Sequence, residues 1–336
     1  MPVGEFDAIG RIRALAEQAA GNSLLSLGIG DDCCLLDCPG GELLALSTDT
    51  MVEGVHFSTR YFSWRDAAGR ACAAAISDLA AMAAEPVCML AAATVPKTGG
   101  EKILDELAEG FLEAASLWNC PLAGGDLAST TGPVTLTITV AGRCAPAAAL
   151  RRSGASPGDE IWITGECGDP SAAIELLERA GAECGSALQN LPENVQNSLF
   201  RPTPRLREAA ELLELGPPTA MIDVSDGVAA DTGHILEESG CGAVLERKAL
   251  PAGEFSRRRA EDCGLPAEHY FLHGGEDFQL LFTLRSGKLE QTGRELNCGT
   301  RITRIGRITA ETGKLLIENS DGTLEPLERS GFDHLA

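Results

Sequence analysis

Five short segments of the sequence place aspartate beside glycine, serine or threonine. They are G-I-G-D-D (28–32), S-T-D-T (47–50), S-D-L-A-A (77–81), G-G-D (124–126) and D-V-S-D-G (223–227). Oxygen ligands of this kind select hard cations such as Mg²⁺ or Ca²⁺, and neighbouring glycines let a backbone or a phosphate approach closely. If the segments converge, two carboxylates ~5 Å apart at an effective dielectric of ~20 repel by about 3 kcal/mol. Bound divalent cations would remove that repulsion.

Each aspartate taken singly also has an ordinary structural role. Asp in a turn, or at the N-cap of a helix as at Asp226, is the commoner use of such a residue. Asp78 fits that role least, because the Ala-rich run 65–84 predicts a buried helix with Asp78 in its middle. A carboxylate in such a place has to be paired or bound to a metal.

Phosphate binding is not explained by the common glycine-rich motifs. No G-x-x-x-x-G-K-[ST] occurs, and no G-x-G-x-x-G follows a predicted strand. The remaining candidates are the Gly-Gly turns at 124–125 and 274–275, the S-D-G at 225–227, and Arg152, which could pair with an anionic oxygen. These residues indicate metal-assisted phosphoryl transfer or metal-dependent hydrolysis, and they leave both open.

The composition indicates which kinds of partner the protein binds and in which cellular compartment it works. The chain has 27 Lys and Arg against 49 Asp and Glu, a net charge of -22, which disfavours nucleic acid and anionic membranes. None of the twelve cysteines forms a C-x-x-C pair, so we expect reduced thiols and a cytoplasmic protein. Charged residues near the N-terminus argue against a signal peptide, and no apolar run is long enough to span a membrane.

A length of 336 residues predicts about two domains at ~150 residues each. The turn-rich stretch 151–159 places the boundary near 150, giving domains 1–150 and 151–336. In the first domain we expect helices at 5–20, 65–84 and 101–118, and strands at 24–29, 43–47, 87–95, 134–141 and one ending at 124–126. In the second we expect strands at 160–164, 220–224, 243–246, 278–284 and within 302–317, helices at 171–180, 204–215 and from 226, and a loop-rich segment up to 204.

The ordered set of motifs resembles the thiamine-monophosphate kinase family, within the superfamily of aminoimidazole ribonucleotide synthetase and selenophosphate synthetase. Besides the aspartate segments, the matching pieces are G-E-F (4–6), the extension M-V-E-G-V-H-F (51–57), R-S-G-A-S-P-G-D (152–159), G-G-E-D-F-Q-L (274–280) and G-F-D-H (331–334). The resemblance covers nearly the whole chain. The V-E-G-V-H-F segment separates this kinase branch from its relatives.

The resemblance implies a two-domain α/β (α+β) fold. An N-terminal mixed-sheet domain would bind ATP and Mg²⁺ and form a dimer barrel with a second copy, and a C-terminal α/β domain would complete the active site. The implied activity is ATP-dependent phosphorylation of thiamine monophosphate to thiamine diphosphate by direct in-line transfer, with Mg²⁺ as cofactor and a homodimer as the working form. A sister activity of the superfamily and a noncatalytic nucleotide-binding or metal-binding regulator are the alternatives.

The same resemblance assigns individual roles. The implied Mg²⁺ ligands are Asp32, Ser47, Thr48, Asp49, Asp78, Asp126, Asp223 and Asp226, of which Asp32, Asp78 and Asp126 would be catalytic. The implied ATP contacts are Gly125, Asp126, Arg152 and Ser225, and the implied thiamine contacts are His56, Glu276 and Phe332. The chain departs from the family pattern at Arg70, often Lys, at Leu127, commonly Thr, at Ala83, usually Gly, and at Ala75 and Ile76, where an Asn is usual before Ser77.

Overall fold

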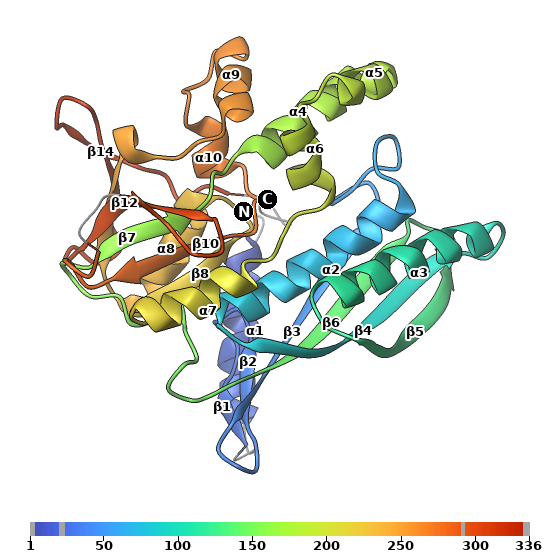
Figure 1. The fold of residues 1–336 in the computed structure, drawn as a ribbon, viewed down its shortest axis with the longest axis horizontal. Coiled ribbons are helices and arrows are strands. Elements are labelled where there is room, and N and C mark those ends of the chain that lie inside the picture. The colour runs from blue at the N-terminus through green and yellow to red at the C-terminus, as the bar shows by residue number, and fades with distance from the viewer. Residues whose placement is uncertain (1–3, 20–23, 290–292, 332–336) are drawn as a thin grey trace.

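The computed structural model describes residues 4–19, 24–289 and 293–331, which form two sheets with helices packed on them (Figure 1). The first sheet has six strands in the order β1-β2-β3-β6-β4-β5. These strands are β1 (Leu25–Leu27), β2 (Cys34–Asp37), β3 (Leu43–Val52), β4 (Glu85–Pro96), β5 (Leu122–Thr130) and β6 (Thr135–Cys144). Among the described strands of this sheet only β4 and β5 pair in parallel, and α3 (Gly100–Leu117) makes the crossover between them.

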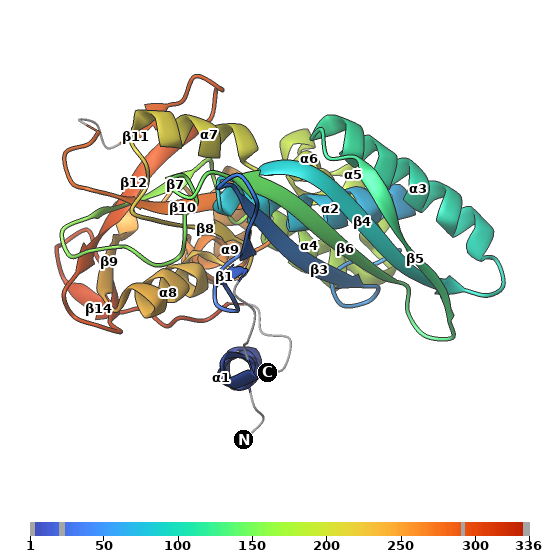
Figure 2. The same ribbon diagram turned by 90° about the horizontal axis from the view of Figure 1, so that it is seen from below.

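One face of the first sheet is covered by α3 and by α2 (Trp64–Ala81), while the other carries no helix (Figure 2). Ser63 caps α2 by accepting a hydrogen bond from the backbone N–H of Asp66, and most of the helix is buried because alanine dominates it. The end of α2 reaches the second domain, where Ala80 and Ala81 join a cluster with Trp162 and other buried residues. This helix therefore carries Asp78 to the junction of the two domains.

The second sheet has the order β14-β13-β9-β12-β7-β10-β8, with β11 paired to β12. Its strands are β7 (Glu160–Thr164), β8 (Ala220–Val224), β9 (Gly242–Glu246), β10 (Gln279–Leu284), β11 (Gly293–Glu295), β12 (Arg301–Thr309), β13 (Leu315–Glu318) and β14 (Leu324–Pro326). The accompanying helices are α4 (Asp169–Ala180), α5 (Cys184–Gln189), α6 (Glu193–Phe200), α7 (Leu206–Leu215), α8 (Val228–Ser239), α9 (Glu254–Asp262) and α10 (His269–His273), with short 3₁₀ turns η1 (Gly181–Glu183) and η2 (Arg247–Ala249). Both expected α/β units are thus present.

Two expectations about the elements were wrong. The loop-rich segment before residue 204 contains α5 and α6. The G-G-D segment lies inside β5, and Thr48 and Asp49 lie inside β3, so these residues do not follow strand ends. The first sheet is open within the described residues of one chain, with β1 and β5 at its edges. The dimer barrel that the resemblance implies needs a second copy and stays a prediction. The boundary near 150 falls in the connection from β6 to β7 and stays a prediction.

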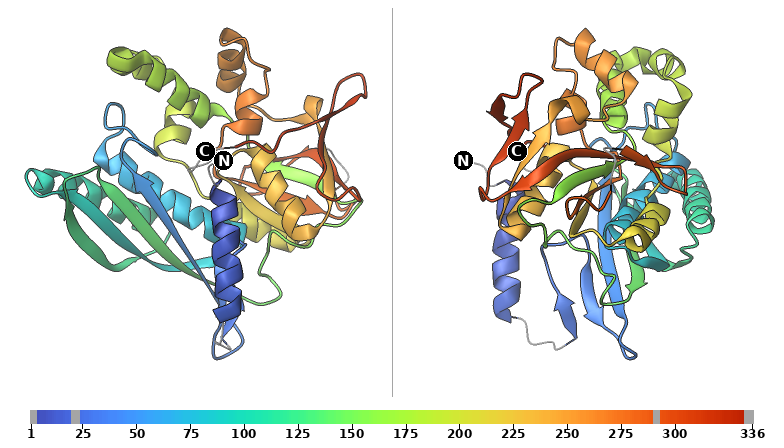
Figure 3. Two further views of the ribbon diagram at one scale, coloured as in Figure 1. Left: turned by 180° about the vertical axis from the view of Figure 1, so that it is seen from behind. Right: turned by 60° about the vertical axis from the view of Figure 1, so that its left-hand side comes forward.

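Helix α1 (Glu5–Ala19) stands beside the two sheets (Figure 3). The sequence predicts an apolar stripe on this helix, and its members Ile12 and Leu15 are 59% and 66% exposed. Arg13 holds the helix to the second domain through Glu238 of α8, at 2.5 Å. None of the helices in the described parts of the chain has the length and apolar character needed to cross a membrane.

Candidate active site

A cleft of about 750 Å³ opens where the two domains meet. Its walls come from α1, the 28–32 loop, β3 and α2 on one side, and from Arg152, the end of β8 and α8 on the other. Four of the five aspartate segments therefore reach one cavity, although they are spread over some two hundred residues of sequence. The fifth, G-G-D, does not line it.

Three carboxylates meet at the base of this cleft. Asp32 from the 28–32 loop, Asp78 from α2 and Asp223 from β8 each place one oxygen within 4.8 Å of the others. Asp32 and Asp223 are almost fully buried. Oδ2 of Asp32 is buried without a hydrogen bond from any residue that the structure describes. An oxygen cluster of this kind fits a hard divalent cation.

Burial and mutual repulsion make ionisation of these groups unfavourable. Burial, then Asp32, raises the pKa of Asp223 to about 8. The pKa of Asp78 lies well above its ordinary value because of burial and the charges of Asp49, Asp223 and Asp32. For Asp49, burial followed by Glu276 and Asp32 raises the pKa to about 6. Without a cation the cluster cannot hold all its charges near neutral pH.

Arg152 supplies the positive charge that faces this cluster. Its guanidinium donates through Nε and Nη2 to Oδ1 of Asp32, the first at 3.1 Å. Its backbone N–H donates to the carboxylate of Asp31, whose pKa is raised to about 7 by burial and by Asp32. Arg152 thus lies where the sequence predicts an ATP contact, although here its partner is a predicted metal ligand.

Strand β3 divides its polar residues between the two faces of the sheet. Ser47 and Asp49 are on the face of α2, and Ser47 Oγ donates to Oδ2 of Asp78. The hydroxyl of Thr48 is on the opposite face, 3.0 Å from that of Thr139. Thr48 therefore stays a predicted ligand through its main chain alone, because its hydroxyl points away from the carboxylates.

A second ligand group contains residues that the sequence reasoning missed. Asp226 lies with Asp231 and His234 of α8, and the ligand atoms of all three are within 4.8 Å of one another. Burial, then the charges of Arg152 and Arg329, lowers the pKa of His234 to about 4, so the imidazole is neutral at physiological pH. The i, i+3 spacing of Asp231 and His234 after D-V-S-D-G was the available signal.

Gly125 and Asp126 lie apart from these groups within one chain. They are on the exposed edge strand β5, and the sheet order puts β6 and β4 between β5 and β3. Three strand spacings separate Asp126 from β3 by roughly 14 Å. Asp126 is also in register with Ala92, Thr137 and Thr50, on the face opposite Asp49. Within the described residues of one chain Asp126 does not reach the other predicted ligands, and its role as a ligand stays a prediction.

A second cavity, of about 570 Å³, holds two of the three predicted thiamine contacts. His56 lines it from the turn after β3, and its Nδ1 accepts the backbone N–H of Val52 at 2.9 Å. Glu276 lines it from the loop before β10, while α4 forms the opposite wall. The charge of Glu276 also helps to raise the pKa of Asp49, after burial, so a residue of this cavity interacts electrostatically with a residue of the cleft. Phe332 lies outside the described residues.

Comparison with known proteins identifies the family. Residues 30–144 match AIR synthase related protein, N-terminal domain, and residues 156–317 match AIR synthase related protein, C-terminal domain. Thiamine-monophosphate kinase of Salmonella typhimurium is 36% identical over 344 residues, covering 100% of this chain and 99% of the relative. The chain belongs to the thiamine-monophosphate kinase family. The Bacillus subtilis member is 32% identical over 345 residues, covering 98% of this chain and 99% of its own.

Solved structures of the thiamine-monophosphate kinase family share the architecture. AaThiL complexed with AMPPCP and TMP superposes with a TM-score of 0.82 at 25% identity, over 99% of this chain and 97% of that one. The kinase of Stenotrophomonas maltophilia K279a gives a TM-score of 0.72 at 32% identity, over 96% and 98% of the two chains. The expected family and the two-domain fold class are confirmed. The individual roles assigned to the site residues stay predictions.

Proposed function

We propose that this chain transfers the γ-phosphoryl group of ATP to thiamine monophosphate, giving thiamine diphosphate and ADP. One observation carries the proposal: a carboxylate cluster suited to divalent cations lies in one cavity, and Asp49 of that cavity interacts electrostatically with Glu276, which lines a second cavity. Phosphoryl transfer between two bound substrates needs two neighbouring sites. The full-length similarity to thiamine-monophosphate kinases supports the choice of substrates.

The residues of the cleft fit Mg²⁺. Asp32, Asp78 and Asp223 offer only carboxylate oxygens, and the unbonded, buried Oδ2 of Asp32 is accounted for if it is a ligand. Asp49, Asp226 and the main chain at Ser47 and Thr48 would complete the set. When bound, Mg²⁺ would neutralise the phosphate charges that otherwise repel one another.

The protein has no need of a general base in this reaction. The acceptor is a phosphate whose second pKa is near ~6, so its attacking oxygen is ionised at neutral pH. The task of the chain is to bring two polyanions together in line. Arg152 donates hydrogen bonds to Asp32 in this structure, and it lines the cleft together with Ser225. When ATP binds, Arg152 would donate to a phosphate oxygen in place of the carboxylate of Asp32.

Two predicted contacts suit the aminopyrimidine of the acceptor. Because Nδ1 of His56 accepts a backbone hydrogen bond, the proton of the neutral imidazole is on Nε2, which makes that atom a donor. The carboxylate of Glu276 is an acceptor for an amino group. Phe332 is the predicted stacking partner of the thiamine rings.

We infer that the active form is a homodimer in which the partner supplies Gly125 and Asp126. The helix-free face of the first sheet exposes Leu90, which is 44% accessible, and β5 is an uncovered edge. Asp126 lies on that same face. Pairing of two such faces would bury this surface and give Asp126 a route to the cleft of the other copy.

We further propose a cytoplasmic location. All twelve cysteines are free thiols in the structure, and most are buried. A chain with this many unpaired cysteines suits a reducing compartment, where ATP is also available.

Product analysis tests the proposed activity. The protein is incubated with ATP, Mg²⁺ and thiamine monophosphate, and thiamine diphosphate and ADP are quantified over time. Equal amounts of the two products are expected, with none when EDTA replaces Mg²⁺. ADP formed without thiamine diphosphate would identify an ATPase and refute the proposal. Unphosphorylated thiamine serves as the control acceptor, because it lacks the attacking phosphate and should give no product.

A further inference from the structure

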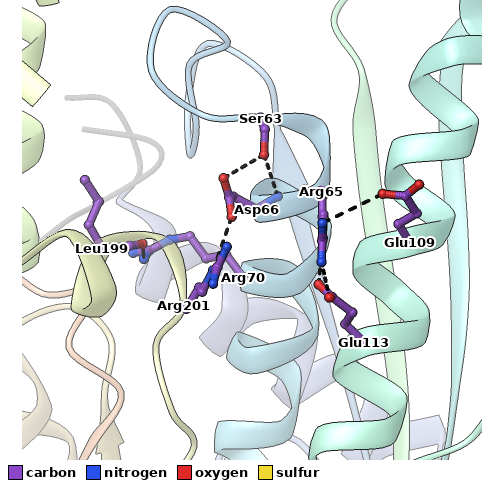
Figure 4. Close-up of polar contacts among 8 residues, drawn as sticks. All are labelled: Ser63, Arg65, Asp66, Arg70, Glu109, Glu113, Leu199 and Arg201. Atoms are coloured by element: carbon purple, nitrogen blue, oxygen red, sulfur yellow. Dashed lines mark hydrogen bonds and ion pairs between the residues drawn. The ribbon is translucent and has the colours of Figure 1, made fainter. Parts of the chain in front are cut away.

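Arg70 is a fully buried cation on α2. It contacts Glu276, a residue that lines the second cavity, which is called the acceptor cavity from here on. The side chain of Arg70 has 0% exposure, and its Nη2 forms an ion pair with Oε2 of Glu276. Nη1 donates to the carbonyl oxygen of Leu199 at the end of α6 (Figure 4). The guanidinium carbon lies 5.4 Å from the ring centroid of Phe278 and 6.0 Å from that of Phe62. A buried guanidinium of this kind requires a counter-charge.

Glu276 supplies that charge while remaining part of the cavity wall. Its side chain is 29% exposed, so the carboxylate is shared between the buried pair and the cavity. The neighbouring Asp277 accepts a backbone hydrogen bond from Gly168 at 2.8 Å. Among the described residues only Oε2 of Glu276 is hydrogen-bonded by a side chain, which leaves Oε1 for a ligand.

The backbone at Glu276 also needs an anchor. Glu276 has a φ of 65°, in the left-handed region that a non-glycine residue seldom adopts. Its N–H donates to the carbonyl oxygen of Ser225 at 2.7 Å, which ties the loop to the nucleotide side of the cleft. Fixing both ends of this residue determines where its free oxygen lies.

We propose that Arg70 is a positioning residue for acceptor selection: it holds Glu276 so that Oε1 accepts a hydrogen bond from an N–H donor on the heteroaromatic ring of the acceptor. This inference rests on the proposed function. Through Phe62, Leu199 and Phe278, Arg70 also connects the segment before α2, α6 and the 274–278 loop. Arg70 itself does not line the cavity, so its effect passes through Glu276.

Steady-state kinetics of Arg70→Met, Arg70→Lys and Glu276→Gln test the proposal. Arg65→Met is the matched control, because Arg65 is on the same helix but pairs with Glu109 and Glu113 on the outer surface (Figure 4). We expect Arg70→Met to raise the KM for thiamine monophosphate about tenfold, the effect of losing one charged hydrogen bond, with the KM for ATP changed less than twofold. Arg70→Lys should recover part of the loss, and Arg65→Met should match the wild type.

Two further measurements separate positioning from general packing. The first compares thiamine monophosphate with an analogue whose pyrimidine amino group is replaced by oxygen. Wild type should prefer the amino compound, and Arg70→Met should lose most of that preference. The second is the double variant Arg70→Met/Glu276→Gln, whose KM should exceed that of the worse single variant by no more than about twofold.

Several outcomes would overturn the inference. They are an unchanged KM for thiamine monophosphate in Arg70→Met, equal rises in both KM values, or single effects that multiply in the double variant. If Arg70→Met does not fold, Arg70→Lys and Glu276→Gln carry the same comparison, and retained amino-group preference in both would refute the role. Wild-type turnover, measured alongside, distinguishes failure of this inference from failure of the proposed function.

Discussion

Replacing Asp49 by asparagine should stabilise the protein in the absence of metal, by an amount that grows from about pH 4 and is complete above about pH 6. Asp49 titrates at about 6 in the folded chain because burial, then Glu276 and Asp32, oppose its ionisation. In the unfolded chain an aspartate titrates near ~3.9. In the folded state Asp49 therefore keeps its proton to a higher pH than in the unfolded state. The free energy of unfolding of the wild type then falls as pH rises from about 4 through about 6.

The size of the effect follows from the two pKa values. Each pH unit between them is worth about 1.4 kcal/mol, which gives about 3 kcal/mol, and partial exposure of the side chain reduces this to about 2 kcal/mol. Asparagine does not ionise, so the variant lacks this loss. The difference in free energy of unfolding, Asp49→Asn variant minus wild type, should rise by about 2 kcal/mol between pH 4 and pH 8.

Urea denaturation in EDTA at pH 4, 6 and 8 measures this difference. Asp105→Asn, a change at an exposed aspartate of α3, is the matched control and should show no pH-dependent difference from wild type. With saturating Mg²⁺ at pH 8 the order should reverse, because wild type gains binding free energy that the Asp49→Asn variant largely lacks. A difference that is constant across pH, or wild type remaining the more stable at pH 8 without metal, would refute the argument from carboxylate repulsion.

Three other predictions concern single residues. Asp78→Asn should lower kcat by at least about a hundredfold while the metal-free protein keeps its fold, as judged by circular dichroism, because a ligand charge is lost; activity near wild type would contradict this. Ala83→Gly should raise the free energy of unfolding by up to about 1 kcal/mol, because Ala83 follows α2 with a φ of 51°, where glycine is favoured; a loss of stability in urea would disprove it. Mixing inactive Asp126→Asn with inactive Asp78→Asn should restore up to about a quarter of wild-type activity through mixed dimers, and no recovery would place Asp126 in its own chain's site or outside the site.

The pattern of apolar residues predicted many of the helices and strands. The strands at 160–164 and 220–224 have the predicted bounds, since short apolar runs flanked by turn residues leave little freedom. The Gly-Gly pair at 124–125 led to the prediction that the strand ends at 124–126. In the structure, parallel pairing with β4 continues the strand through this pair. The short helices α5 and α6 were not predicted, because polar residues interrupt the apolar periodicity of their sequences.

The sequence marked the carboxylates that meet in the cleft but not the residues that contact them. Aspartate beside small residues marked Asp32, Asp78 and Asp223 correctly as neighbours, since each ends or interrupts an apolar element. The pair of Arg70 and Glu276 joins residues 206 positions apart, which no local pattern reveals. The separation of Asp126 from the cleft depends on strand order in the first sheet, and strand order is a property of the whole fold.

The stereochemical course at phosphorus tests the central claim most directly. The cleft is lined by carboxylates that suit metal binding, and the acceptor brings its own ionised oxygen, so the phosphoryl group should pass from ATP to thiamine monophosphate in one step. With ATP made chiral at the γ-phosphorus by three oxygen isotopes, the thiamine diphosphate should show inversion. Net retention would require a phosphorylated protein group as an intermediate and would contradict the account.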